Sequence, residues 1–358
     1  MRSQNLSVCS TQSTSREIMV SDNSSPQEPT ATKRQRPEMK IGTHSGTFHA
    51  DEALAVYMLK LLPKYKNSTV VRSRTPDILE ACDIIVDVQG KYDGLKHFDH
   101  HQRDFSETFS TDFKTKLSSA GLIFKHFGKE IISDELNTSV DSADVSLLYT
   151  KLYSAFVEAI DGNDNGESAY PDNIKPAYNA SGITLPSIVA GYNPSWNEPR
   201  DDVYMDTQFE KASKLMGEVF SSKLKFYAKS WLPARELVRT ALVESTKYDD
   251  EGRIMVFDTT VTWKGHLFDL EEEMKIEGRT LYVLYSDGAS WRVQAVPVSN
   301  ESFTSRKPLP EPWRGVRDQA LSDLTGIDGG IFVHASGFIG GNKTREGALE
   351  MAKKALEM

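Results

Sequence analysis

The sequence has little cysteine, no long apolar run and no excess of positive charge. Its two cysteines, Cys9 and Cys82, are too few for a disulfide framework or a cysteine-based zinc site, which favours a reducing compartment. The longest apolar runs, such as residues 84–86, fall far short of the roughly 18 residues that a membrane span requires. The net charge of −9 argues against a protein that coats duplex DNA by charge alone. We therefore expect a soluble, intracellular, globular protein with no membrane partner.

The first part of the chain differs in composition from the rest. Residues 1–39 are rich in Ser, Thr, Gln and Pro, and they cannot bury enough apolar area to order themselves. The basic cluster Lys33–Arg36 is compatible with nuclear import and equally with a solvated charge run. No acid precedes Glu17, which is a weak signal for mitochondrial import. We expect the nucleus or the mitochondrion as the location, with the cytoplasm as the alternative.

Strands alternate with helices over residues 40–190. Strand-like runs at 41–43, 69–71 and 83–88 are interleaved with helical patterns, the first of them at 51–62. This alternation predicts a doubly wound α/β fold with a mainly parallel sheet. The complete predicted organisation is a tail at 1–39, a catalytic domain at 40–200, a connector helix at 201–235 and a domain at 236–358.

The second half of the chain contains more strand-like runs than helical patterns. Residues 236–243, 253–257, 280–285 and 291–298 read as strands, and a closing helix is predicted at 345–356. Many strands with few helices predict a smaller, mixed α+β domain.

Five of the eight histidines lie between His44 and His101, interleaved with Asp51, Asp87 and Asp99. Several of these residues follow predicted parallel strands, whose carboxyl ends meet at one edge of the sheet. The pattern therefore predicts a metal site, although Asp51 alone could be a helix-start carboxylate and Asp87 alone a turn former. Carboxylates combined with imidazoles suit two Mn²⁺ or Mg²⁺ ions, which catalyse phosphoester hydrolysis.

A further acid follows an apolar helix at Asp161, within the segment 161–166. The oxygen spacing and terminal Glu of a calcium loop are missing from this segment. A simple Asn/Gly turn is the alternative, but the upstream cluster favours Asp161 as one more metal ligand.

Four motifs in order resemble those of the DHH phosphoesterase superfamily. They are GTHSGTFHADEA at 42–53, VDVQG at 86–90, DHH at 99–101, and Asp161. Together with FVHASGFIGGNKT at 332–344, they make the chain similar to the melanocyte-proliferating-gene family of DHH-type exonucleases, over residues 41–358. The resemblance implies a DHH-type metal-binding domain and a metal-dependent phosphodiesterase. It also implies a 3′–5′ exonuclease that acts on single-stranded RNA or oligonucleotides.

The same resemblance assigns roles to individual residues. His101 would face the scissile phosphate, and Asp99 would orient the neighbouring imidazoles. His49 stands where many superfamily members have an aspartate. The implied metal ligands are His44, His49, Asp51, Asp87, His100 and Asp161. From composition alone, the segment before the last helix could be only a Gly-rich turn. The implied substrate-binding residues in it are His334, Ser336, Gly337, Gly340, Gly341, Asn342, Lys343 and Arg345.

Two rival functions remain open at this point. A small-molecule phosphohydrolase that cuts a phosphoanhydride, a dinucleotide or a very short oligonucleotide would have the same site. The second rival is a protein that keeps the fold but only binds a metal or a nucleotide. The full set of ligand-type residues argues against this second rival. The sequence does not determine the oligomeric state.

Overall fold

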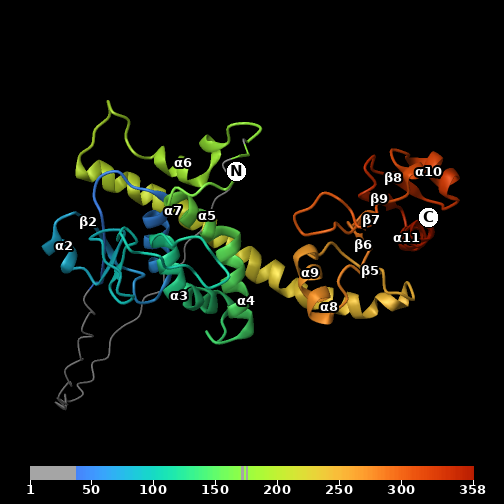
Figure 1. The fold of residues 1–358 in the computed structure, drawn as a ribbon, viewed down its shortest axis with the longest axis horizontal. Helices are drawn as coiled ribbons and strands as arrows, with labels where there is room; N and C mark the ends of the chain where they lie inside the picture. The colour runs from blue at the N-terminus through green and yellow to red at the C-terminus, as the bar shows by residue number, and fades with distance from the viewer. Residues whose placement is uncertain (1–37, 171–172, 175) are drawn as a thin grey trace, which may run out of the picture. The chain divides into compact units, whose positions relative to one another are not determined.

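The computed structural model describes residues 38–170, 173–174 and 176–358. The tail up to residue 37, with the basic cluster Lys33–Arg36 and the residues considered for mitochondrial import, lies outside these described residues. Glu38–Met358 contains two β-sheets and the helices that pack on them (Figure 1). None of the described helices is both long and apolar enough to cross a membrane.

The first sheet has four strands in the order β2-β1-β3-β4, and every neighbouring pair is parallel. In β3, Ile84 and Val86 face the main core, whereas Ile85 packs with Leu79 on the opposite face. The all-apolar sequence of β3 reflects this burial on both faces. The strands are β1 (Lys40–Thr43), β2 (Thr69–Arg72), β3 (Ile84–Val86) and β4 (His97–Phe98).

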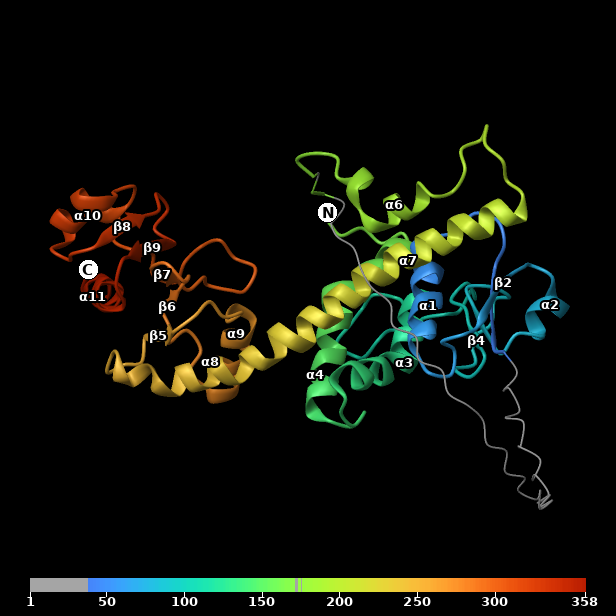
Figure 2. The same cartoon turned by 180° about the vertical axis from the view of Figure 1, so that it is seen from behind.

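Helices pack on this sheet, and α1 lies against α3 and α7 (Figure 2). Helix α1 begins with a capping arrangement in which the Glu52 carboxylate accepts hydrogen bonds from the His49 backbone N–H at 2.8 and 3.0 Å. The helices of this part are α1 (Ala50–Leu61), α2 (Pro76–Glu80), α3 (Ser119–Leu136), α4 (Ala143–Leu152), α5 (Glu158–Asp164), α6 (Leu185–Ala190) and α7 (Asp202–Phe226), with a π-helix at Tyr153–Val157 between α4 and α5.

Helix α7 continues through a second π-helix, Tyr227–Trp231, into α8 (Leu232–Glu244). The prediction of a strand at 236–243 is therefore wrong. The buried residues Val238, Ala241 and Leu242 recur at helical spacing, and they pack against the second sheet from this helix.

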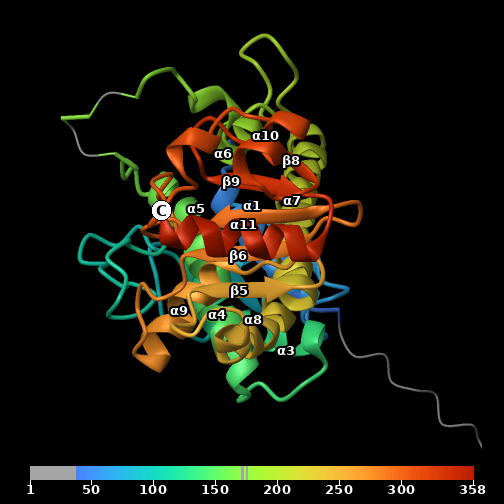
Figure 3. The same ribbon diagram turned by 90° about the vertical axis from the view of Figure 1, so that its right-hand side faces the viewer.

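The second sheet has five strands in the order β5-β6-β7-β9-β8. Strand β6 pairs parallel with β5, and the remaining pairs are antiparallel. Figure 3 shows α11 lying across this sheet. The elements are β5 (Ile254–Phe257), α9 (Lys264–Met274), β6 (Tyr282–Ser286), β7 (Trp291–Ala295), α10 (Asp318–Thr325), β8 (Gly330–Val333), β9 (Ile339–Asn342) and α11 (Arg345–Glu357).

Alternate residues of β6 enter different cores. Tyr282 and Leu284 pack on the side of α11, whereas Val283 and Tyr285 pack on the side of α8 and α9. This is the period of two expected for a strand covered on both faces. A parallel α/β sheet followed by a mixed α+β sheet confirms the predicted fold class.

Candidate metal centre

The carboxyl ends of the parallel strands bring the predicted cluster together. His44 follows β1, Asp87 follows β3, and Asp99-His100-His101 follow β4. His49 and Asp51 lie at the start of α1, after the same edge of the sheet. The parallel strands therefore bring together residues that are up to 57 positions apart, from His44 to His101, as expected for an open α/β sheet.

Three overlapping sets of side chains have ligand atoms within 4.8 Å of one another. Asp87 belongs to two of the sets, and His49 also belongs to two. A carboxylate that two sets share, as Asp87 is, can offer one oxygen to each set. The sets are His44, His49, Glu52 and Asp87; Asp87, His100 and His101; and His49, Asp51 and Asp164.

Asp87 occupies the centre of this arrangement. Its Oδ2 atom lies 3.3 Å from His44 Nε2, and its Oδ1 atom lies 3.5 Å from His100 Nε2. Ser119 donates a hydrogen bond to Oδ1 at 3.0 Å. The backbone at Asp87 is left-handed, with φ of 57°, a conformation that Asp tolerates better than most residues. The residue thus ends β3 and turns its carboxylate toward the imidazoles.

Asp51 has two carboxylate oxygens that are buried without a hydrogen-bond partner. Burial and the charges of Asp87, Asp164 and Glu52 raise its pKa well above the usual range. Four carboxylates crowded together in a buried site repel one another unless a positive charge lies between them. The orphaned oxygens of Asp51 therefore fit a divalent cation, which would supply both the missing contact and the missing charge.

The same negative charges raise the pKa values of two histidines in the cluster, His44 and His100. Burial alone would lower the pKa of His44, but Asp87 and Glu52 outweigh burial and raise this pKa to about 10. Burial likewise opposes the effect of Asp164 and Asp87 on His100, whose pKa rises to about 9. The site therefore favours positive charge beside these carboxylates, whether as protons or as bound cations.

Asp99 orients His101. The buried Asp99 accepts a hydrogen bond at Oδ1 from His101 Nδ1 at 2.7 Å, and at Oδ2 from the Gly90 N–H at 2.6 Å. The side chain of His101 is 61% exposed. Asp99 thus anchors this largely exposed ring through Nδ1.

Asp161 is not among the three sets, although the sequence predicted it as a ligand. Its carboxylate accepts hydrogen bonds from the Ser118 N–H (3.0 Å), the Ser118 hydroxyl (2.7 Å), the Gly121 N–H (2.9 Å) and the Tyr153 hydroxyl (2.9 Å). Asp161 therefore accepts hydrogen bonds from backbone N–H groups at the N-terminus of α3, which have no partner within the helix. Asp164, one helical turn later, lies in the cluster instead, with Oδ2 at 3.0 Å from His100 Nε2.

Sequence reasoning missed two further residues at this site. Glu52, which caps α1, also lies 3.1 Å from His44 Nε2. Arg74 follows β2 at the same sheet edge, with Nη2 3.3 Å from His44 Nδ1. Its place after a parallel strand was the signal that could have found it. Arg74 lines a small cavity of about 250 Å³ together with His49, Asp87 and other residues of the cluster.

Comparison with known proteins finds relatives that match most of this chain. The family model MYG1_exonuc, described as an uncharacterised protein family (UPF0160), matches residues 40–356. The chain belongs to this family. The MYG1 protein C694.04c of Schizosaccharomyces pombe is 55% identical, over 89% of this chain and 98% of that protein. The MYG1 protein YER156C of Saccharomyces cerevisiae is 51% identical, over 88% and 95%. The MYG1 exonuclease of Homo sapiens is 48% identical, over 90% and 88%.

Among solved structures, RecJ from Thermus thermophilus in complex with Mn²⁺ is similar at 14% identity, over 89% of this chain and 52% of that chain. The TM-score is 0.25, and a likeness of this size says nothing about substrate or metal.

The MYG1-family segment at 332–344 joins β8 to β9 and α11. Its exposed tip contains His334, whose Nδ1 lies 2.9 Å from the Ser336 hydroxyl. Gly337, at φ of 73°, is buried, and its N–H donates to the His334 carbonyl at 2.8 Å. Lys343 is exposed, and Arg345 donates a hydrogen bond to the Tyr248 hydroxyl at 3.0 Å. The tip and Lys343 are therefore accessible to a ligand, whereas Arg345 is partly engaged within its own fold.

Three other residues of this segment, Gly340, Gly341 and Asn342, are buried. Gly340 and Gly341 lie in the central strand β9, paired with β7 and β8, so their backbone groups belong to the sheet. A Cβ at Gly341 would lie 2.6 Å from Arg292 Nη1, which explains the glycine. Asn342 is fully buried, and its side chain caps the turn before α11 through the Thr344 N–H. These three residues therefore have structural roles in the sheet and in the turn before α11, and the expectation that they bind substrate stays a prediction.

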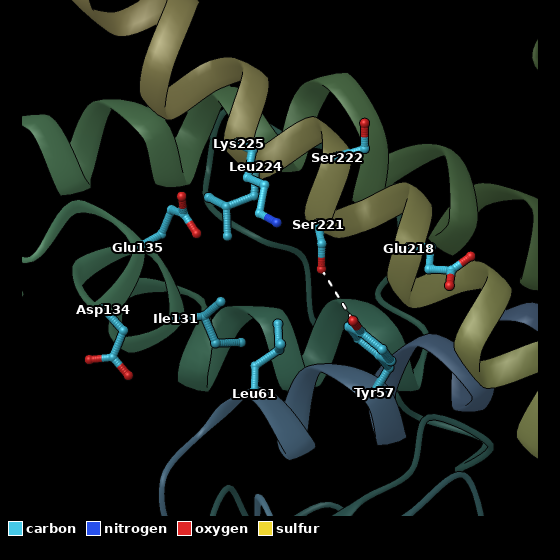
Figure 4. A pocket seen from close by; sticks show the side chains of 10 residues that line it. All are labelled: Tyr57, Leu61, Ile131, Asp134, Glu135, Glu218, Ser221, Ser222, Leu224 and Lys225. Carbon is cyan, nitrogen blue, oxygen red and sulfur yellow. Dashed lines mark hydrogen bonds between the residues drawn. The ribbon is translucent and has the colours of Figure 1, made fainter. Parts of the chain in front are cut away.

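Two cavities on the first part of the chain differ in character. One of about 520 Å³ opens onto the cluster of candidate metal ligands and is lined by His49, Asp51, His101 and Asp164 among others. Another of about 700 Å³ lies between α1, α3 and α7 (Figure 4) and contains no residue of the three sets. In it Ser221 donates a hydrogen bond to the Tyr57 hydroxyl at 3.4 Å. The first cavity is therefore the candidate substrate site.

Proposed function

We propose that this chain is a metal-dependent nuclease that hydrolyses phosphodiester bonds, and specifically a 3′–5′ exonuclease that acts on RNA. The observation that carries the proposal is the set of three overlapping ligand groups, which share Asp87 and His49 and open into one cavity. Membership of a family in which several relatives are named exonucleases supports the nuclease activity. The RNA substrate and the 3′–5′ polarity rest on the family resemblance of the motifs.

The donor set suits two divalent cations, Mn²⁺ or Mg²⁺, because it combines carboxylates and imidazoles without thiolates. Such ions supply Lewis acidity for the phosphate oxygens and lower the pKa of the attacking water. Asp87, which belongs to two of the sets, would offer oxygens to both. The residues that would hold them are His44, His49, Asp51, Asp87, His100 and Asp164.

The remaining residues position the phosphate and handle protons. Asp99 fixes the His101 ring through Nδ1, so that Nε2 can contact the phosphate and pass a proton to the leaving oxygen. Arg74, exposed at the rim of the cluster, adds a positive charge for a phosphate oxygen. In the C-terminal part, the accessible residues His334, Ser336 and Lys343 would contact the RNA substrate.

The test is hydrolysis by the purified full chain with Mn²⁺ or Mg²⁺. Single-stranded RNA and DNA of the same sequence are labelled at the 5′ or the 3′ end, with pyrophosphate and a dinucleotide alongside. We expect stepwise shortening of RNA from its 3′ end. Release of 5′ nucleotides first, or preference for DNA, would correct the polarity or the substrate. Hydrolysis of pyrophosphate alone would favour the small-molecule phosphohydrolase.

A pair of variants ties this activity to the cluster. Asp87→Ala should abolish the hydrolysis of all substrates. Asp112 is an exposed aspartate outside the three sets, and Asp112→Ala should leave hydrolysis unchanged. Full turnover by Asp87→Ala, or by the wild-type chain after exhaustive chelation, would refute the proposed function.

A further inference from the structure

The cavity at the metal cluster adjoins a second cavity that the proposed catalytic residues do not use. The second cavity has a volume of about 610 Å³, compared with about 520 Å³ for the first. Four residues line both of them: Ile160, Asn163, Thr184 and Pro186. The two cavities are therefore neighbouring sections of one groove, with α5 and the start of α6 as their common wall.

The lining of the second cavity is mainly apolar, with acidic groups at its edge. Ala155, Phe156, Ala159 and Leu185 provide apolar surface, and Glu158 and Glu167 provide carboxylates. No lysine or arginine occurs among the described residues that line it. An apolar cavity with a few polar groups suits a small organic ligand, whereas two carboxylates and no cation repel phosphate. The second cavity thus suits an uncharged group, unlike the cluster next to it.

Local structure holds the wall of this cavity in place. The π-helix Tyr153–Val157 forms part of the wall, and such turns are frequent at functional sites. Thr115 donates a hydrogen bond to Glu158 Oε1 at 3.0 Å, which fixes that carboxylate at the cavity. The Glu167 N–H donates to the Gly162 carbonyl at 2.8 Å, which closes the turn at the end of α5.

We propose that this second cavity is a nucleoside subsite, which holds the base and sugar of a nucleotide next to the phosphate at the metal cluster. The inference rests on the nuclease function proposed above and specifies where its substrate lies. The apolar wall would contact the base, and the carboxylates of Glu158 and Glu167 would accept hydrogen bonds from amino groups of the base or hydroxyls of the sugar. The phosphate would lie at the cluster, where bound divalent cations would supply the positive charge.

Filling the cavity tests the assignment. Ala159 is exposed and lines the second cavity but not the first. The indole of Ala159→Trp would therefore occupy the subsite without contacting the candidate metal ligands. Ala143→Trp, at an exposed position of α4 that lines neither cavity, is the matched control. Both are compared with the wild type in the hydrolysis of a short RNA, and in its inhibition by cytidine and by inorganic phosphate.

We expect Ala159→Trp to raise KM for the RNA about tenfold with kcat nearly unchanged, because the lost contact serves ground and transition states alike. Inhibition by cytidine should weaken about tenfold as well, whereas inhibition by inorganic phosphate should not change. Equal inhibition of Ala159→Trp and the wild type by cytidine would overturn the subsite, as would a wild type that cytidine does not inhibit.

Two further outcomes are also informative. If Ala159→Trp hydrolyses nothing, Ala155→Trp, from the preceding helical turn, replaces it. Equal weakening of its inhibition by phosphate and by cytidine would also overturn the proposal. A wild type that hydrolyses no RNA would refute the nuclease function itself. A wild type that hydrolyses RNA with no change of KM in Ala159→Trp would refute only the subsite.

Discussion

The Oδ2 atom of Asp164 lies 3.0 Å from Nε2 of His100, and this contact joins the end of α5 to the residues that follow β4. One turn earlier on the same helix, Asp161 points into the N-terminus of α3 instead. The two aspartates of one short segment therefore have separate roles, one in the cluster and one in the fold. Single substitutions should separate these roles.

Asp164→Asn should abolish metal-dependent hydrolysis while the protein stays folded. The amide keeps the size of the side chain but loses the charge that a divalent cation requires. We expect kcat to fall about 100-fold or more, which corresponds to about 2.7 kcal/mol. Turnover at saturating Mn²⁺ and thermal melting of the same sample measure the two properties. Activity close to that of the wild type would remove Asp164 from the ligand set.

Asp161→Ala should act mainly on stability. The substitution leaves the buried N–H groups of Ser118 and Gly121 and the hydroxyl of Tyr153 without their acceptor. The free energy of unfolding should fall by about 2–4 kcal/mol. Denaturant titration measures it, and Asp112→Ala, an exposed aspartate, is the control. A loss of activity without any loss of stability would return Asp161 to the metal site.

Metal binding should stabilise the wild type and not Asp51→Asn. The carboxylate oxygens of Asp51 are buried without a hydrogen-bond partner, so a cation bound there stabilises the folded state. At 100 times its Kd a metal adds about 2.7 kcal/mol. Melting curves with and without Mn²⁺ or Mg²⁺ would show the shift. The same increase of Tm in Asp51→Asn would mean that the cation binds elsewhere.

His266 should make the C-terminal part sensitive to acid. Burial lowers the pKa of His266, whose Nε2 donates to the Trp231 carbonyl at 2.6 Å. Its Nδ1 is buried without a partner, so the protonated ring is not accommodated in the folded state. The unfolded chain therefore binds the extra proton first, and stability is lost as pH falls below the ordinary value of about 6.5.

His266→Gln should reduce this loss. The slope of the unfolding free energy against pH between 6.5 and 5 should become smaller by up to about 1.4 kcal/mol per pH unit, since one proton fewer is taken up on unfolding. Denaturant titrations across that range compare the variant with the wild type. Identical slopes would show that His266 does not titrate on unfolding.

Deletion of residues 1–39 should leave hydrolysis intact and change where the protein resides. Their composition provides little apolar surface for packing, and Lys33–Arg36 is an import signal in this interpretation. A fluorescent fusion of the full chain, of the deletion and of a variant with Lys33, Arg34 and Arg36 changed to Ala measures the distribution. An unchanged distribution in all three would reduce the cluster to a solvated charge run.

The sequence alone determined the outline of this protein. The apolar strand Ile84–Val86 and the helical spacing in α1 predicted a parallel α/β sheet, because burial on both faces requires such runs. Histidines and aspartates after successive strands predicted a cluster, since parallel strands end at one edge. Where local pattern was ambiguous, as at 236–243, the prediction failed, because only packing against the second sheet showed the helical period.

Only the tertiary structure decided between side chains that share a local pattern. Asp161 and Asp164 lie on the same short helix, and the choice between them depends on which neighbour each meets, the N-terminus of α3 or His100. Burial of Asn342 and the pairing of β9 likewise set structural residues apart from accessible ones in the segment before α11. Sequence spacing specifies the face of an element, whereas hydrogen-bond partners and charges across the fold determine what a carboxylate on that face does.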